Sequence, residues 1–257
     1  MSRILITGSS DGLGLMSARH LADEGHAVTL HARTPERAGD AREALPGAEH
    51  VVVGDVSTIA GVRAVAEQAA STGPFDAVIH NVGIGYREPR RVETVDGLEH
   101  VFAVNVLAPY LLTALLPRPR RLVYLSSGMA RGGSAELDDL QWEHRRWNGA
   151  QAYSDSKLLD TVLAFGVARR WPDVLANTVE PGWVPTRMGG PGAPDDMALA
   201  PVTQAWLAAG EDPATQVTAT HFRHQRPRPA PAPAESSSHQ DALLDYCAGL
   251  TGTPLPT

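Results

Sequence analysis

Short runs of apolar, largely β-branched residues alternate along the chain with longer stretches whose apolar positions return every three or four residues. The short runs predict strands at Arg3–Thr7, Ala27–His31, Glu49–Val53, Asp76–His80, Leu122–Ser126 and Leu175–Glu180. The longer stretches predict helices, most clearly over Thr58–Ser71, Leu98–Leu116 and Gln151–Arg170. Strands separated by helices of this length favour parallel pairing through right-handed crossovers. The pattern therefore predicts an α/β fold, a doubly wound parallel sheet with helices on both faces.

Two stretches interrupt this alternation. Residues 130–149 separate the fifth predicted strand from its helix and contain two tryptophans and many charged side chains. Residues 223–239 are rich in Pro, Ala and Ser, which predicts an extended surface segment. A short helix is expected near Gln240–Leu250.

Composition narrows the class of protein. The 257 residues are 43% hydrophobic and 20% charged, as in soluble globular domains, and the net charge of -7 argues against a nucleic-acid surface. The single cysteine, Cys247, excludes a disulfide within the chain and suits a reducing compartment. No apolar run is long enough to span a bilayer, and the N-terminus begins directly with a strand pattern. We therefore expect a cytoplasmic protein with neither nucleic acid nor membrane as a partner.

A glycine-rich stretch lies where the first strand passes into a helix. Residues Thr7–Gly14 place glycines at Gly8, Gly12 and Gly14. Glycines let the backbone turn tightly and approach a pyrophosphate, and a helix N-terminus offers an anion N–H donors and a favourable dipole. The motif predicts a dinucleotide site, with a simple glycine-rich turn as the alternative.

The ends of the next strands bear on which dinucleotide binds. An acidic residue usually follows the second strand to hold a ribose 2′-hydroxyl, but this chain has Arg33 there. An arginine fork suits a 2′-phosphate, so Arg33 favours NADP(H), unless it is an ordinary surface arginine. Asp55 follows the third strand and is suited to accept from an adenine amine or to cap a turn. Asn81–Gly83 follows the fourth strand, where a cofactor would cross the sheet.

The strongest chemical signal is the pair Tyr153 and Lys157, which are four residues apart and therefore share one face of a helix. An isolated tyrosine titrates near pH 10, and an ammonium group nearby stabilises the phenolate. Lys157 is the only lysine of the chain, since every other cation is an arginine. This composition favours a functional pair over an exposed helical pair.

Two further polar residues fit the same chemistry. Ser126-Ser127 ends the fifth strand, where a serine hydroxyl can hydrogen-bond a substrate oxygen; a turn serine is the alternative. Asn105 lies inside an apolar helix, where a buried amide needs partners. It would hold a water or a lysine in a proton relay, or only fix the backbone.

Taken together and in order, these residues resemble the short-chain dehydrogenase/reductase family over about Arg3–Thr186. The resemblance implies a single Rossmann-type domain with a catalytic set of Asn105, Ser127, Tyr153 and Lys157. It implies cofactor contacts from Gly8, Ser9, Ser10, Asp11, Gly12, Leu13, Gly14, Arg33, Asp55, Val56, Asn81, Val82, Gly83, Tyr153, Lys157, Pro181, Gly182, Val184 and Thr186. In this resemblance, the segment Pro181–Thr186 contacts the nicotinamide side.

One departure from the family pattern concerns spacing. Ser127 and Tyr153 are 26 residues apart, about twice the commonest family spacing. Retinol-dehydrogenase-like and protochlorophyllide-reductase-like branches carry a similar insertion, here residues 130–149. We expect a catalytic domain over residues 1–222, in which this insertion and the substrate-loop region 187–210 wall the substrate pocket. The Pro-rich segment 223–239 and a C-terminal helix and tail, 240–257, would follow.

The resemblance implies hydride transfer between NADP(H) and a small-molecule carbonyl or alcohol substrate. Tyr153 would exchange the proton, Ser127 would hold the oxygen, Lys157 would stabilise the phenolate and bind the ribose, and Asn105 would maintain a water link. Reduction of a carbon–carbon double bond and a non-catalytic NADP(H)-binding sensor are the alternatives. Histidines are scattered, so no metal is expected, and a homo-oligomer is compatible with the family. An apolar or aromatic substrate is suggested by four side chains: Met129, Trp142, Trp147 and Trp183.

Overall fold

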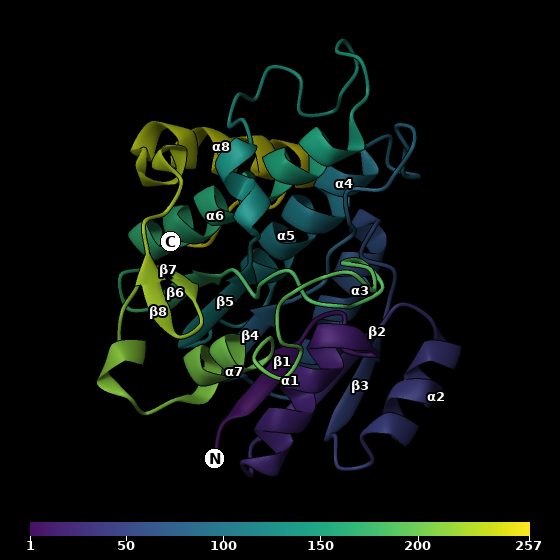
Figure 1. Cartoon of the computed structure of the whole chain (residues 1–257), viewed down its shortest axis with the longest axis vertical. Helices are drawn as coiled ribbons and strands as arrows, with labels where there is room; N and C mark the ends of the chain where they lie inside the picture. Colours follow the sequence, from purple (N-terminus) through teal and green to yellow (C-terminus); the bar gives the residue numbers. More distant parts are fainter.

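Eight strands form one sheet in the order β3-β2-β1-β4-β5-β6-β7-β8 (Figure 1). The computed structural model describes residues 1–257. The strands are β1 (Arg3–Ile6), β2 (Ala27–Ala32), β3 (His50–Val53), β4 (Ala77–His80), β5 (Arg121–Leu125), β6 (Leu175–Val179), β7 (His221–Arg223) and β8 (Arg226–Arg228). Strands β1 to β7 pair in parallel and only β8 is antiparallel. The strand order reverses between β1 and β4, which is where such sheets bind ligands.

The helices follow the predicted alternation. They are α1 (Gly12–Asp23), α2 (Pro35–Ala44), α3 (Ile59–Ser71), α4 (His100–Phe102), α5 (Ala108–Leu115), α6 (Gly149–Arg170), α7 (Val202–Ala209) and α8 (Ser237–Thr251). Local capping explains several starts: the side chains of Thr34, Thr58 and Asn148 accept backbone N–H groups at the first turns of α2, α3 and α6.

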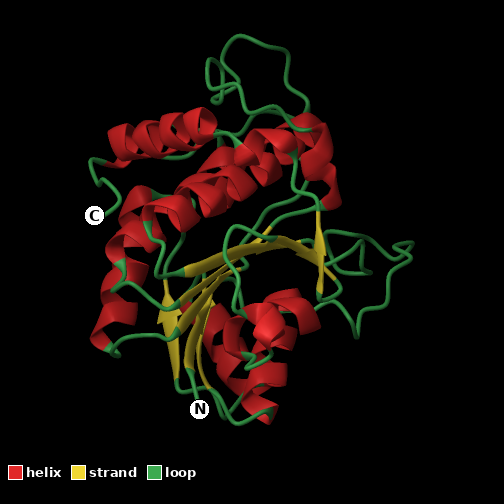
Figure 2. Cartoon of the chain, turned by 90° about the vertical axis from the view of Figure 1, so that its left-hand side faces the viewer, coloured by secondary structure: helices red, strands yellow, loops and turns green.

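The helices cover the sheet on both faces (Figure 2). Along β1, Ile4 and Ile6 belong to one apolar core and Leu5 to the other, as expected when side chains alternate across a strand. The core around Leu5 contains α3, α5 and α6, whereas the core around Ile4 contains α1 and α7. The predicted doubly wound α/β sheet is therefore confirmed.

A second helix layer lies over α6. Every residue from Ala152 to Ala168 is buried, because the sheet covers one side of α6 and α8 covers another (Figure 2). The tail after α8 is tied down by side chains: Tyr110 Oη donates to the carbonyl of Thr253 at 2.8 Å, and Trp171 Nε1 donates to the carbonyl of Pro256 at 2.7 Å. The tail thus helps to enclose the helix that carries Tyr153.

Three predictions of secondary structure need correction. The helix predicted over Leu98–Leu116 consists of α4, a π-helical turn at Ala103–Leu107 and α5. The segment 223–239 is not simply extended: it contributes to β7 and contains β8 and a 3₁₀ turn at Ala232–Glu235, and α8 begins at its end. Helix α7, within the region 187–210, was not predicted. Strands β7 and β8 have only three residues each, and β8 contains Pro227 at the edge of the sheet. Such short strands show too little alternation of apolar and polar residues to be predicted from the sequence.

Candidate active site

The turn between β1 and α1 requires glycine for two reasons: some positions have a positive φ, and one leaves no room for a side chain. Gly8 and Gly12 have φ of 63° and 55°, a left-handed conformation that favours glycine. A Cβ on Gly14 would stand 2.5 Å from Nδ2 of Asn81, so any side chain there would displace the turn. Asp11 precedes α1 without capping it through its side chain, which leaves the first N–H groups of the helix for an anion. The turn therefore fits a dinucleotide pyrophosphate.

Two side chains, Asn81 after β4 and His31 in β2, hold this turn in place. Asn81 Nδ2 donates to the carbonyls of Thr7 and Gly8, both at 2.9 Å. Nδ1 of His31 accepts the N–H of Gly8 at 2.9 Å, and its Nε2 lies 2.9 Å from the carbonyl of Gly54. Burial lowers the pKa of His31, which keeps the ring neutral and able to accept at Nδ1. The cofactor turn is thus cross-linked to the ends of β2, β3 and β4.

The sequence did not reveal Arg37 as a member of the adenosine side of the site. Arg33 is exposed just after β2, as predicted. Arg37, in the first turn of α2, donates to Oγ of Ser10 at 3.0 Å and to Oδ2 of Asp11 at 2.6 Å. Arg37 thus contacts the glycine turn through Ser10 and Asp11. The only feature of the sequence that could have pointed to Arg37 is that it is an arginine four residues after Arg33.

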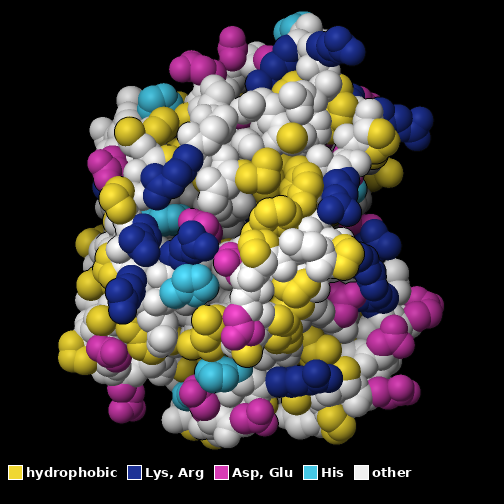
Figure 3. Space-filling view, viewed as in Figure 1, with side chains coloured by type: hydrophobic (Ala, Val, Ile, Leu, Met, Phe, Trp, Pro, Cys, Tyr) yellow, Lys and Arg dark blue, Asp and Glu magenta, His cyan; other side chains and the backbone are white.

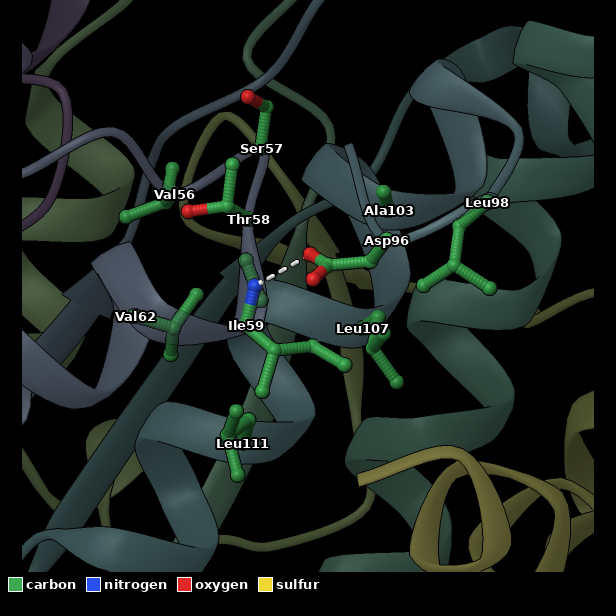
Figure 4. Close-up of a pocket in the computed structure, with 11 residues that line it drawn as sticks. Val56, Ser57, Thr58, Ile59, Val62, Asp96, Leu98, Ala103, Leu107 and Leu111 are labelled. Carbon is green, nitrogen blue, oxygen red and sulfur yellow. Dashed lines mark hydrogen bonds between the residues drawn. The ribbon is translucent and has the colours of Figure 1, made fainter. Parts of the chain in front are cut away.

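The third strand leads into a small, mostly apolar hollow with a volume of only about 10 Å³ (Figure 4). Asp55 is exposed and its Oδ1 accepts the N–H of Ser57 at 2.9 Å, so it also serves as a turn residue. Val56 lines the hollow together with Leu107 of the π turn, and Asp96 accepts the N–H of Ile59 at 2.8 Å (Figure 4). The hollow lies directly beyond the predicted adenine contact.

Tyr153 and Lys157 lie one turn apart on α6 and are only 6% and 4% exposed. Nζ of Lys157 donates to the carbonyl of Leu125, the last residue of β5, at 2.5 Å, and lies 3.5 Å from Oδ2 of Asp160. A Cβ on Gly83 would stand 3.6 Å from this Nζ. The ammonium group therefore sits at the carboxyl ends of β4 and β5, next to the predicted cofactor path.

Asn105 lies in the π turn, and its amide is fully engaged. Oδ1 accepts the N–H of Ile84 at 2.9 Å, while Nδ2 donates to the carbonyl of Ile84 at 3.1 Å and to Oγ of Ser156 at 2.9 Å. The side chain thus holds the loop after β4 against α6. Sequence reasoning correctly expected partners for this buried amide, but not that Ile84 and Ser156 would supply them.

The two serines after β5 have different surroundings. The hydroxyl of Ser126 is buried and donates to the carbonyl of Lys157 at 3.0 Å. Ser127 is half-buried, and its Oγ accepts the N–H of Met129 at 3.3 Å, which leaves its proton for another acceptor. No direct hydrogen bond links Asn105, Ser127, Tyr153 and Lys157 to one another, although the fold brings them to one sheet edge.

The segment after β6 is held by charged groups that sequence reasoning missed. Gly182 has a φ of 96°, and the following N–H, of Trp183, donates to Oδ2 of Asp195 at 2.7 Å. Arg223 lies 3.3 Å from Asp195 and 3.6 Å from Glu180. The hydroxyl of Thr186 accepts the N–H of Gly189 at 3.1 Å, and Val184 is buried. The Pro181–Thr186 segment thus has a fixed shape beside the strand ends.

The insertion 130–149 is anchored to α6 through a residue between Tyr153 and Lys157. Asp155 accepts from the N–H of Ser134 at 2.8 Å and from Arg145 Nη2 at 3.0 Å. Trp142 is only 6% exposed and lies under the guanidinium of Arg145, 3.6 Å from its carbon to the ring centre. Trp147 packs edge-on against Trp142.

The four side chains suggested for an apolar or aromatic substrate have different surroundings. Trp142 is buried in the packing of the insertion, and Trp147 is half-buried, with its Nε1 donating to the carbonyl of Glu88 at 2.9 Å. Met129 and Trp183 are 36% and 55% exposed. Burial therefore keeps Trp142 from a ligand, and an apolar or aromatic substrate stays a prediction.

A doubly wound sheet with a glycine turn after β1 and a buried tyrosine–lysine pair at the same sheet edge defines a class of dinucleotide-binding oxidoreductases. The family model described as short chain dehydrogenase matches residues 2–131. An uncharacterised oxidoreductase of Emericella nidulans is 43% identical over 262 residues, covering 100% of this chain and 99% of that protein. The chain belongs to the short-chain dehydrogenase family.

Other relatives agree with this assignment. Human retinol dehydrogenase 14 is 34% identical over 213 residues, covering 72% of this chain and 62% of that protein. A crystal structure of an uncharacterised protein from Mycobacterium paratuberculosis superposes with a TM-score of 0.86 at 26% identity, covering 100% of this chain and 96% of that one. The predicted resemblance, including the retinol-dehydrogenase-like relatives, is confirmed. None of the helices combines the length and the apolar character needed to cross a membrane.

Proposed function

We propose that the chain is an NADP(H)-dependent oxidoreductase that interconverts a carbonyl compound and an alcohol. The observation that carries the proposal is the position of the only lysine. Lys157 is buried, and its ammonium donates to the carbonyl of Leu125 and lies beside Gly83, one helical turn from Tyr153. A buried cation in such a place is expensive to desolvate, which favours a functional role over a structural one.

The residues around the glycine turn fit a dinucleotide. Gly8 and Gly14 let the turn pack tightly against Val82 and Asn81, Gly12 borders open space, and the first N–H groups of α1 have no side-chain cap. Arg33 follows β2 and is exposed, and the guanidinium of Arg37 contacts Ser10 and Asp11 in the glycine turn; two arginines in this part of the chain favour a 2′-phosphate and hence NADP(H). Asp55 would contact the adenine, and Pro181–Thr186 the nicotinamide side.

When bound, the nicotinamide supplies or accepts the hydride. The hydroxyl of Tyr153 gives its proton to the carbonyl oxygen in the reductive direction and takes it back from the alcohol in the other. The free hydroxyl proton of Ser127 forms a hydrogen bond to the same oxygen and stabilises the charge that develops on it. Lys157 stabilises the phenolate and reaches the ribose, and Asn105 keeps the loop after β4 and α6 in register.

The test is NADPH oxidation, and separately NADH oxidation, by the purified protein with ketones, aldehydes, quinones and enones. We expect Tyr153→Phe to lower kcat by roughly 10²- to 10⁴-fold, because it removes the proton donor. NADPH binding, measured by fluorescence, should be retained. Turnover that survives in Tyr153→Phe would contradict the proposal, and turnover confined to enones would indicate reduction of a carbon–carbon double bond.

The cofactor preference has its own variants. Removing both guanidinium groups in Arg33→Ala/Arg37→Ala should raise KM for NADPH roughly tenfold or more, because charge-assisted hydrogen bonds to the phosphate are lost. KM for NADH should change little. Arg90→Ala, which removes an exposed arginine elsewhere, is the control for loss of positive charge. Equal effects on the two cofactors would overturn the preference.

A further inference from the structure

Tyr86 lies at the one place where the loop after β4, the catalytic helix and the segment after β6 meet. Its ring packs edge-on against the ring of Tyr153, with centroids 5.7 Å apart. Its hydroxyl donates to the carbonyl of Met188 at 3.4 Å. A Cβ on the preceding Gly85 would stand 2.7 Å from Cγ of Met188, so the two segments are in close contact. Tyr86 is half-buried, and one part of it faces outward.

The backbone around Tyr86 is held rigidly from the side of the insertion. A Cβ on Gly149 would stand 2.5 Å from the carbonyl oxygen of Glu88 and 3.2 Å from that of Tyr86, so this close approach requires glycine. Trp147 holds the carbonyl of Glu88, and Nδ1 of His100 lies 2.7 Å from the carboxylate of Glu88. Together with the two hydrogen bonds between Asn105 and Ile84, these contacts hold the backbone on both sides of Tyr86 before any substrate binds.

The neighbouring surface is apolar and soft. The chain exposes five large apolar side chains, and three of them follow β5 or β6: Met129, Trp183 and Leu199. Nε1 of Trp183 donates to the carbonyl of Gly189, the residue after Met188. Figure 3 shows apolar side chains gathered in the middle of the face, with arginines on its flanks. Flat rings and flexible thioethers of this kind complement a planar apolar molecule.

Building on the proposed function, we infer that Tyr86 determines substrate specificity by packing its ring against an aromatic or conjugated carbonyl compound held at Tyr153. The Tyr86 side chain is held beside Tyr153 by its edge-on ring contact and by the hydrogen bond to Met188. From this position the ring contributes an edge or face contact to the substrate. The hydroxyl has a separate task, which is to hold Met188 and therefore the segment after β6. The substrate class is thus planar and aromatic rather than a short aliphatic carbonyl.

The experiment compares acetophenone with 2-butanone under NADPH in the wild type, Tyr86→Leu and Tyr86→Phe. Tyr86→Leu should lower the ratio of kcat/KM for acetophenone to that for 2-butanone by roughly 2- to 10-fold, mainly through KM for acetophenone. Tyr86→Phe keeps the ring and should restore the wild-type ratio. Binding of 1-phenylethanol in the presence of NADPH, measured by calorimetry, should weaken only in Tyr86→Leu.

The matched control is Tyr246→Leu. Tyr246 also packs edge-on against an aromatic ring, that of Phe102, and its hydroxyl also has a protein partner, Gln141, but it lies on α8. This variant should leave the ratio unchanged. An equal loss for both ketones in Tyr86→Leu would overturn the inference while leaving the proposed oxidoreductase in place. Turnover that persists in Tyr153→Phe would instead remove the proposed function itself.

Discussion

At the scale of single residues, the surroundings of Lys157 hold a carboxyl group that the catalytic proposal does not use. Asp160 lies one turn further along α6, its side chain is 2% exposed, and its Oδ1 has no hydrogen-bond partner. Burial raises the pKa of Asp160 from 3.8 to about 7, although the ammonium of Lys157 acts in the opposite direction. The phenol of Tyr124 faces Asp160 from β5, and burial raises its pKa as well. The carboxyl is therefore protonated in part near neutral pH.

This protonation gives a stability prediction for Asp160→Asn. A carboxyl whose pKa is raised by folding stabilises the native state fully below pH 3.8, and that contribution is lost as the pH rises through about 7. The asparagine variant has no such loss, so its unfolding free energy relative to the wild type should increase between pH 5 and pH 8. Urea unfolding at both pH values measures it. The exposed Asp138→Asn serves as control, and a difference that is constant with pH would disprove the account.

At the scale of elements, the sequence pattern was most informative where a strand or helix was long. The strands β1 to β6 and helix α6 follow from periodicity within one or two residues at each end. The π turn could not be predicted from the sequence. It adds one residue to a helical turn, and all five of its residues are buried, so its apolar pattern looks like that of a buried α-helix. Arg37 and Asp195 were missed for another reason: their roles depend on tertiary contacts with Asp11 and Trp183 that no local signal encodes.

Asp155 joins the insertion to α6 at several points, which gives a prediction for Asp155→Ala. The side chain of Asp155 is 4% exposed, and its removal takes one acceptor from each of Arg145, Gln151 and the N–H of Ser134. We expect a loss of about 2–4 kcal/mol in unfolding free energy and faster proteolysis within residues 130–149. Asp138→Ala, in the same insertion but exposed, should have neither effect. Unchanged proteolysis in Asp155→Ala would show that packing alone holds the insertion.

At the scale of the whole molecule, α8 and the tail cover α6 from the side opposite the sheet. Besides Tyr110 and Trp171, Arg63 donates to the carbonyl of Thr251 and to Oγ1 of Thr253, at 2.8 and 2.9 Å. Arg118, which stacks over the ring of Trp171, donates to the carbonyl of Thr257 at 2.9 Å. Arg118 and Trp171 precede the amino ends of β5 and β6, whereas the candidate site lies at the carboxyl ends.

A variant that lacks residues 252–257 should therefore lose stability without losing the site. The hydrogen bonds from Arg63, Arg118, Tyr110 and Trp171 to these residues would disappear, which we expect to cost about 2–4 kcal/mol. Thermal unfolding measures the loss, and NADPH binding below the transition should remain within about twofold of the wild type. A large fall in NADPH affinity with an unchanged melting temperature would contradict this separation of tail and site.

The cross-linked turn after β1 has a consequence for the thermodynamics of cofactor capture. Asn81 and His31 already hold the backbone of Thr7 and Gly8 in place, and Gly8 and Gly14 already occupy their special geometry. The conformational entropy of this turn is therefore lost when the chain folds and not when the dinucleotide arrives. The pyrophosphate would therefore bind to a turn that is already ordered. Because binding does not have to order this turn, the affinity for the dinucleotide is higher than it would be for a flexible turn.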